Sequence, residues 1–339
     1  MAGASPEAAQ RLRLLEDPVR FRGHLLRELN GSEQSVRLFL DRCEGDLSPS
    51  SVLLLLARRP RRAGADPSVS GRKGEICLVL NKRSRRVRQA GDLCCPGGTV
   101  EAELDPWLAR FLMLPGSPLW MWPHWGRLKR NSPEEARLLA LLLATSLRES
   151  WEEMRLNPVL LRFLGFLPPQ RLRLYQRVIH PMVGWIYFQK RFVPSWEVES
   201  IVYIPLISLL KADGYARLRL HVSPGLRRRF PQGVQDYPCF IHEDGNDTEI
   251  LWGATYWIVT RFLEKVLGFC APDPVLAGHL FVFVLRQSGN DDHLRRQAPL
   301  SNGLQQVNAA ESRHLDIEEH EPGGDSASGG PVRASRRAA

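Results

Sequence analysis

Apolar residues recur along the chain in short blocks that are separated by polar segments containing glycine and proline. Two such blocks, residues 52–57 and 76–80, flank a loop rich in Arg, Gly, Pro and Ser and predict two core strands. Similar blocks at residues 163–167, 181–189 and 201–204 predict further strands. Their length and spacing favour a sheet buried in the middle of a mixed α/β domain.

Between and around these blocks, the apolar spacing changes to three and four residues, which is the period of an amphipathic helix. Residues 18–29 and 33–43 show this period before the first predicted strand. A final helix is expected over residues 255–266, with Thr255 as a suitable N-cap. The pattern therefore predicts helices at both ends of the sheet-forming region.

The clearest helix signal begins at Ser132, which predicts an N-cap followed by Pro133 in the first turn and Glu135 at the capping-box position. The apolar period continues to residue 156, and Asn157 followed by proline predicts the end of the helix. We expect one long helix here.

Residues 104–131 interrupt this regular pattern. The segment fits no clean helical or strand period, so we interpret it as an insertion. Its aromatic residues predict either a lid or apolar wall for a ligand, or packing against the domain's own flank or a dimer partner, and we favour packing. The segment contains Trp107, Trp120, Trp122 and Trp125, together with four prolines.

The predicted organisation has an accessory helical segment at residues 1–47 and a main domain at 48–268, with the insertion at 104–131. Residues 269–286 are interpreted as a C-terminal extension. Residues 287–339 carry few large apolar groups, so we predict a disordered tail.

Composition narrows the class of protein. The 339 residues are 43% apolar, which is enough to bury a sizeable core, and the net charge is +9. Arginines supply most of the positive charge and suit phosphate-bearing ligands, but they are scattered instead of forming one stripe. We therefore expect a small-molecule partner and no nucleic acid.

The cysteines and the N-terminus indicate the compartment. No CxxC spacing is present, which argues against a zinc site and favours reduced thiols. The start of the chain lacks a signal-peptide pattern, and the longest largely apolar run, residues 138–147, is too short to span a bilayer. We expect a soluble cytoplasmic protein without a membrane partner. The six cysteines are Cys43, Cys77, Cys94, Cys95, Cys239 and Cys270.

Three acidic residues in the predicted long helix carry the candidate chemistry. Glu149, Glu152 and Glu153 stand at positions i, i+3 and i+4, so their side chains are neighbours and repel by roughly 0.2 to 0.5 kcal/mol per pair. A divalent cation would relieve that repulsion, and carboxylate oxygens suit Mg²⁺ or Mn²⁺. The alternative is a solvated acidic surface balanced by neighbouring arginines.

The residues around this trio resemble the signature of the Nudix hydrolase family, G-x5-E-x7-R-E-U-x-E-E-x-G-U, where U is a bulky aliphatic residue. Residues 148–156 read R-E-S-W-E-E-M-R-L and match the second half, and residues 97–105 read G-G-T-V-E-A-E-L-D and match the first. The resemblance implies an α/β/α sandwich with a mixed sheet, with the signature helix on one face and the helix at residues 255–266 on the other.

A further resemblance points to the coenzyme A pyrophosphatase-like branch of that family. Residues 80–98, ending in G-D-L-C-C-P-G-G, are similar to its marker element, and residues 180–184, 197–199 and 250–255 follow in order. The resemblance covers about residues 50–266. It implies a hydrolase that cleaves the diphosphate linking a nucleoside to another moiety, with coenzyme A or its acyl esters as leading substrates.

The family resemblance also implies roles for individual residues. Glu149, Glu152 and Glu153 would ligate Mg²⁺ or Mn²⁺ together with the backbone carbonyl of Gly97. Either Glu149 or Glu152 would also accept a proton, and Arg148 would orient the carboxylates by ion pairing. These catalytic and metal-binding roles all fall on the two halves of the signature.

The same branch resemblance suggests where the substrate would bind. Arg83 and Arg88 fall on the marker element, and with Arg86 they could hold a diphosphate, while Gly98 lets backbone approach the ligand. A solvated strand edge is the alternative for these arginines. The oligomeric state stays open, with a homodimer as one alternative.

The chain departs from the family pattern at three positions. Arg155 stands where glycine is usual, Ser150 replaces an aliphatic residue, and Leu104 stands where the first half requires an acid. One of four carboxylates could substitute for the missing acid, three of them close to that position and Glu135 from beyond the insertion. The alternative functions are a Nudix hydrolase of another dinucleotide or sugar nucleotide, and a degenerate binding or regulatory module. The four carboxylates are Glu101, Glu103, Asp105 and Glu135.

A later segment offers weaker candidates. His180 precedes a proline in an apolar run, so we interpret it as structural and not as a catalytic base. One more metal ligand could come from the acids Glu197, Glu199, Glu243 and Asp244.

Overall fold

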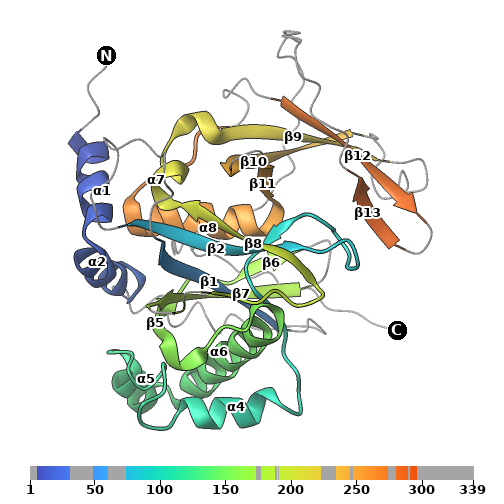
Figure 1. Cartoon of the computed structure of the whole chain (residues 1–339). Coiled ribbons are helices and arrows are strands. Elements are labelled where there is room, and N and C mark those ends of the chain that lie inside the picture. The colour runs from blue at the N-terminus through green and yellow to red at the C-terminus, as the bar shows by residue number, and fades with distance from the viewer. Residues whose placement is uncertain are drawn as a thin grey trace, which may run out of the picture. The chain divides into compact units, whose positions relative to one another are not determined.

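The computed structural model, drawn in Figure 1, describes residues 6–30, 49–59, 74–172, 177–187, 189, 191–222, 234–244, 247–273, 280–288 and 291–295. All of them lie in one compact unit formed by residues 1–299. The helix predicted at residues 33–43 and the predicted tail beyond residue 295 fall outside the described residues.

A mixed sheet forms the centre of this unit, with strand order β3-β2-β1-β7-β5. Strand β1 (Pro49–Arg59) runs parallel to β7 (Arg177–Ile186) and antiparallel to β2 (Glu75–Arg83). At the edges, β3 (Leu93–Cys94) pairs with β2 and β5 (Leu161–Phe166) pairs with β7, both antiparallel. The apolar blocks that predicted strands are therefore confirmed, with shifted boundaries.

Three further strands extend the sheet. The short β4 (Gly97–Thr99) pairs antiparallel with the start of β1, and β8 (Val198–Pro205) pairs with β2. Strand β6 (Gln170–Leu172) pairs with β7. The pairing of β4 with β1 places the two glycines of the signature beside the centre of the sheet.

Helices cover both faces of the sheet, as the α/β/α prediction requires (Figure 1). The long α6 (Pro133–Met154) packs on one face, and α2 (Pro18–Asn30) and α8 (Gly253–Leu267) pack on the other. Along β1, Leu53 and Leu55 pack into the hydrophobic core between the sheet and α6, which we call the α6 core. Leu54 and Leu56 pack into the core on the opposite face, which we call the α8 core. Burial on both faces explains why this strand is a continuous apolar run instead of an alternating one.

A second sheet, with order β11-β10-β9-β12-β13, was not predicted from the sequence. Its apolar residues Tyr215, Phe240 and Leu251 join the core on the α8 side of the first sheet. Strand β13 shows that part of the segment expected to be a disordered tail is paired in this sheet. The strands are β9 (Tyr215–Val222), β10 (Val234–Asp244), β11 (Asp247–Trp252), β12 (Leu280–Ser288) and β13 (Asp291–Arg295).

The tryptophan-rich insertion contains two short helices, although its sequence shows no clean helical period. Helix α4 (Asp105–Leu112) and helix α5 (Trp125–Asn131) both pack beside α6. Pro106 lies in the first turn of α4, where proline is tolerated because the amide hydrogens of that turn have no helical partner. This proline therefore does not interrupt the helix. Trp122 and Trp125 are buried in the α6 core, which confirms packing as one use of the aromatic residues.

The remaining helices are short or N-terminal. They are α1 (Pro6–Glu16), α7 (Leu206–Leu209) and the 3₁₀ turns η1 (Pro158–Leu160) and η3 (Ala212–Gly214). Helix α1 was not predicted. No described helix combines the length and the apolar character needed to cross a bilayer.

Two predicted caps differ from the structure. Ser132 occupies the N-cap position of α6, but its side chain makes no capping hydrogen bond. Thr255 lies inside α8, whose N-cap is Trp252, because the turn at Gly253 starts the helix two residues earlier. The five described cysteines are free thiols, as expected, and Cys43 falls outside the described residues.

Candidate active site

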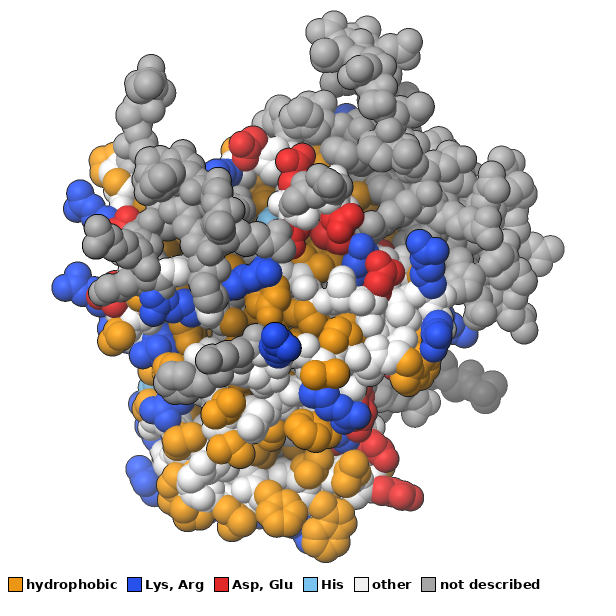
Figure 2. Space-filling model, viewed as in Figure 1, with side chains coloured by type: hydrophobic (Ala, Val, Ile, Leu, Met, Phe, Trp, Pro, Cys, Tyr) orange, Lys and Arg blue, Asp and Glu red, His pale blue; other side chains and the backbone are white. Residues whose placement is uncertain are grey.

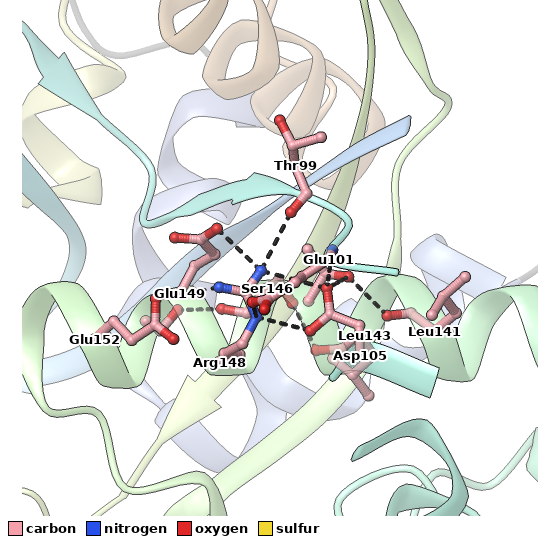
Figure 3. Close-up of polar contacts among 11 residues, drawn as sticks. Thr99, Glu101, Asp105, Leu141, Leu143, Ser146, Arg148, Glu149 and Glu152 are labelled. Carbon is pink, nitrogen blue, oxygen red and sulfur yellow. Dashed lines mark hydrogen bonds and ion pairs between the residues drawn. The ribbon is translucent and has the colours of Figure 1, made fainter. Parts of the chain in front are cut away.

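Arg148 is the centre of the polar contacts at the C-terminal half of α6 (Figure 3). Its Nη2 donates to Oε1 of Glu149 at 3.1 Å, and its Nη1 donates to Oε2 of Glu152 at 3.1 Å. The same Nη2 donates to the backbone oxygen of Thr99, at the end of β4, at 3.2 Å. One buried guanidinium therefore fixes two of the three signature carboxylates and ties them to the glycine strand.

Asp105 holds the other side of this guanidinium. Its Oδ1 accepts from Arg148 Nε at 2.7 Å, and its Oδ2 accepts from Arg148 Nη2, from Thr145 Oγ1 and from the amide of Glu101. The Asp105 side chain is fully buried. Charge-assisted bonds of this length are strong, and the carboxylates together raise the pKa of Arg148 despite its burial.

This arrangement decides among the four acids that could replace the missing carboxylate at Leu104. Asp105 makes the short buried contacts, whereas Glu101 Oε2 lies 3.7 Å from Arg148 Nε and its side chain is half exposed. Glu103 is exposed, and Glu135 lies in the first turn of α6, at the opposite end of the helix from Arg148. The acid that pairs with the signature arginine is therefore displaced by one residue along the chain.

Glu153 points away from Arg148 toward the sheet. Its Oε2 accepts from Nδ2 of Asn81 on β2 at 2.8 Å and from the amide of Gly97 at 3.3 Å. Burial, and then the charge of Glu149, raise the pKa of Glu153 to about 8, and burial also raises the pKa of Glu149. A buried carboxyl group beside a second, partly buried one thus favours a cation in this part of the molecule.

Gly98 leaves the room that Glu149 occupies. A Cβ atom on Gly98 would overlap the carboxylate of Glu149, including its Oε1 atom. Neighbouring Gly97 has a φ of 151°, and a Cβ there would overlap the backbone of Ser51 and Val52. The two glycines therefore have different roles: Gly97 permits the pairing of β4 with β1, and Gly98 accommodates the carboxylate.

The donor chemistry suits Mg²⁺ or Mn²⁺, since three carboxylates and nearby backbone oxygens are hard ligands. Among the residues that the structure describes, however, no group of three acidic, histidine or cysteine side chains is arranged around one point. Glu149 and Glu152 turn toward Arg148, and Glu153 turns toward Asn81. To bind a cation together, Glu149 or Glu152 would therefore have to give up its contact with Arg148. The absence of a side chain at Gly98 leaves room for the carboxylate of Glu149.

The arginine-rich loop between β2 and β3 lies next to this site. Arg83 Nε donates to the backbone oxygen of Arg88 at 2.8 Å, and the charge of Arg83 lowers the pKa of Glu153 against the effect of burial. The Arg88 side chain is exposed, as is that of Arg86. Arg83 therefore lies close enough to Glu153 to affect its pKa, and it also holds the backbone at Arg88.

The loop before β8 joins the arginine loop to the end of α6. Ser84 Oγ donates to the backbone oxygen of Trp196 at 2.8 Å, and the Ser84 amide donates to the backbone oxygen of Glu197. The amide of Ser195 in turn donates to the backbone oxygen of Glu153 at 2.8 Å. These bonds fix the spacing between the arginines and the carboxylates.

Among the later acids that were considered as extra ligands, Glu197 lies in the loop before β8 and Glu199 contacts Lys82. Lys82 Nζ lies 2.6 Å from Glu249 Oε1 and 3.4 Å from Glu199 Oε1, which links β2 to the second sheet and to β8. Glu243 and Asp244 lie at the end of β10. His180 is buried, and burial lowers its pKa to about 4, which fits the structural role predicted for it.

Sequence reasoning missed Asn81 and Thr145. Asn81 is fully buried at the end of the apolar run of β2, and an amide in that position was a signal, because a buried polar side chain requires a partner. Its Oδ1 has no hydrogen-bond partner among the described residues. Thr145 carried no comparable signal, since its contact with Asp105 depends on how the insertion folds back.

Comparisons with known proteins give only distant matches. No family model matches the chain, and no curated protein matches it in sequence. A Nudix hydrolase from Alicyclobacillus acidocaldarius is 12% identical, covering 68% of this chain and 100% of its own, with a TM-score of 0.32. The Nudix domain of Shewanella oneidensis NrtR, complexed with ADP ribose, is 14% identical over 53% of this chain and 86% of its own, with a TM-score of 0.29. A Caenorhabditis elegans Ap4A hydrolase is 11% identical over 48% and 84%, respectively, with a TM-score of 0.29.

Proposed function

We propose that the chain is a metal-dependent Nudix-type hydrolase that cleaves the diphosphate of a nucleoside diphosphate linked to another moiety. The single observation that carries this proposal is the Arg148 cluster, where one buried guanidinium holds Glu149 and Glu152 beside Gly97 and Gly98. A solvated acidic surface would not require a fully buried partner such as Asp105 on the other side of the arginine.

Arg148 and the three glutamates would have different roles in this reaction. Arg148 fixes the direction of the Glu149 and Glu152 carboxylates, and either of these accepts the proton of the attacking water. Glu153, held by Asn81 and Gly97, completes the oxygen donors. A bound Mg²⁺ or Mn²⁺ would lower the pKa of water and neutralise charge on the phosphoryl oxygens.

The substrate is held by the arginine loop in this proposal. Arg83 and Arg88 supply guanidinium groups that pair with phosphate oxygens in two-point contacts. Coenzyme A and its acyl esters are the leading substrate class, supported by the branch-like residues 80–98 that carry these arginines. Other dinucleotides and sugar nucleotides share the diphosphate and belong in the same assay.

A substrate screen tests the proposal. The purified chain is incubated with coenzyme A, ADP-ribose, NADH and dinucleoside polyphosphates in Mg²⁺ or Mn²⁺, and phosphorus NMR follows the loss of the diphosphate signal. We expect metal-dependent cleavage, with coenzyme A preferred. Calorimetry that detects no uptake of either metal, with or without nucleotide, would exclude the metal site.

The matched variants are Glu152→Gln and Glu134→Gln. Glu152 is half exposed, so its substitution leaves the fold intact, and we expect turnover to fall at least about a hundredfold. Glu134 is an exposed glutamate in the first turn of α6 and should tolerate the same change. Equal turnover in both variants would remove the site assignment.

A further inference from the structure

The helical insertion exposes an unusual number of large apolar side chains. Trp107, Phe111 and Leu114 are 60%, 63% and 54% exposed, and Trp120 and Met121 are 44% and 36% exposed. We call these five residues the insertion face. Figure 2 shows apolar side chains gathered along the lower edge of the molecule, where Figure 1 places α4 and α5.

This exposure is not a sign of a loosely folded segment. Ala109 and Leu112 on the other side of α4 are buried in the α6 core, as are Trp122 and Trp125. Trp107 and Phe111 stand four residues apart, so they form one stripe on the outer side of α4. The insertion therefore has one apolar side that anchors it and a second that faces solvent, and a contiguous exposed apolar surface marks an interaction site.

The charge around the insertion face indicates the kind of partner. Residues 106–133 contain four basic residues, Arg110, Arg127, Lys129 and Arg130, all exposed, and no aspartate or glutamate. The guanidinium of Arg110 lies 4.6 Å from the centre of the Trp107 ring. Two copies of such a surface would bring like charges together, so self-association through it is disfavoured.

Exposed aromatic side chains beside basic ones suit an anionic lipid surface, and the exposed acids Glu103 and Glu134 stand just beyond the two ends of this segment. Tryptophan prefers the boundary between lipid headgroups and acyl chains, and lysine and arginine contribute attraction to anionic headgroups. We propose that the insertion face docks the protein peripherally on an anionic phospholipid membrane. Such docking needs no spanning segment, and the sequence-based expectation of no membrane partner considered only spanning and signal segments.

The proposed docking helix also contributes to the candidate active site. Helix α4 begins with Asp105, whose carboxylate holds Arg148, and Trp107 follows two residues later. The docking proposal itself does not depend on the proposed hydrolase activity, because it is measured by binding alone.

Vesicle sedimentation of the full chain tests the proposal. Vesicles of phosphatidylcholine alone are compared with vesicles that also contain phosphatidylglycerol, and we expect binding to the anionic vesicles that weakens in high salt. The double variant W107S/F111S should lower the partition coefficient at least about tenfold, since it removes two aromatic anchors. The control V19S/V159S changes two exposed apolar residues outside the insertion and should bind as the original chain does.

Two further measurements separate the outcomes. Brominated lipids should quench tryptophan fluorescence of the original chain, and W107S/F111S should lose this quenching while keeping its circular dichroism spectrum. Failure to bind anionic vesicles, equal binding to neutral ones, or unchanged binding by W107S/F111S would overturn the proposal. Light scattering that finds a dimer dispersed by the same substitutions, without vesicle binding, would assign the face to self-association instead and also overturn it.

Discussion

Arg148 Nε donates to Asp105 Oδ1 at 2.7 Å, which joins the signature helix to the first residue of α4, within the insertion. The insertion is therefore part of the site and not an appendage to it, because the residue that orients the signature arginine is also the residue that starts α4. The 42 residues between Asp105 and Arg148 fold so that the acid and the arginine still meet.

Asp105→Asn tests this relationship. The amide keeps the size of the side chain but removes the charge opposite Arg148, so Arg148 should hold Glu149 and Glu152 less firmly. We expect kcat to fall about 10- to 100-fold with a smaller change in KM, and the free energy of unfolding to fall by about 1 to 3 kcal/mol. Steady-state kinetics and urea denaturation measure the two effects.

The control for that variant is Glu101→Gln, which removes an exposed carboxylate 3.7 Å from the same guanidinium. Exposed ion pairs contribute little, so activity should change less than about threefold. A larger loss in the Glu101 variant than in the Asp105 variant would show that the wrong acid has been assigned to Arg148.

The two signature glycines should separate activity from stability. In Gly98→Ala the new methyl group overlaps only the flexible end of Glu149, so the chain should fold and lose activity, by about tenfold or more. In Gly97→Ala the methyl group overlaps the backbone of β1 at a φ that alanine rarely adopts, so folding should be impaired. Thermal unfolding and turnover of both variants check this, and reversed results would contradict it.

The raised pKa of Glu153 predicts a pH-dependent stability. Between its ordinary value of 4.5 and about 8, the folded chain keeps a proton that the unfolded chain has released. Unfolding therefore releases a proton, and the contribution of Glu153 to the free energy of unfolding falls as pH rises through this window.

Glu153→Gln removes this effect and keeps the hydrogen-bond acceptor for Asn81, while its NH₂ group can donate to Asn81 Oδ1. In EDTA the variant should gain stability over the original chain by up to about 1.4 kcal/mol per pH unit between pH 5 and 8. Added Mg²⁺ should stabilise the original chain more than the variant. Parallel pH profiles of urea denaturation in EDTA would refute the raised pKa.

The sequence predicted the first sheet and α6 because their signals are local. Continuous apolar runs identify strands buried on both faces, and the change to a 3.6-residue period identifies α6. The acidic trio and Arg148 could be placed on one helix for the same reason. The second sheet was missed because its pairing joins distant segments, among them the parallel pair β9 and β12, and no local period indicates such pairing.

Within the site, contacts along α6 were predictable and contacts between elements were not. The Arg148–Glu152 pair follows from helical spacing, whereas Asp105, Thr145 and Asn81 reach the site only through the fold of the insertion and of β2. Of the departures from the family pattern, Ser150 proves to be accommodated locally, since its hydroxyl donates to the backbone oxygen of Ser146 at 2.6 Å.

Arg155 explains why glycine is usual at that position of the motif. It follows the end of α6 with φ 54° and ψ 41°, the left-handed conformation that commonly closes a helix and that costs a side-chain-bearing residue about 1 to 2 kcal/mol. Its guanidinium recovers part of this cost over the ring of Trp151, at 5.3 Å from the centre. Because Trp151 is exposed, that contact contributes only about 0.5 kcal/mol.

Arg155→Gly should therefore stabilise the chain by up to about 1 kcal/mol, because relief of the backbone strain exceeds the lost contact and the added freedom of the unfolded chain. Arg155→Ala should destabilise it slightly, since alanine keeps the strain and loses the contact. Urea denaturation of the three proteins gives the expected order of stability: glycine, arginine, alanine. If the alanine variant were as stable as the glycine variant, the left-handed conformation would not be the source of the strain, and the departure from the family pattern would have another physical cause.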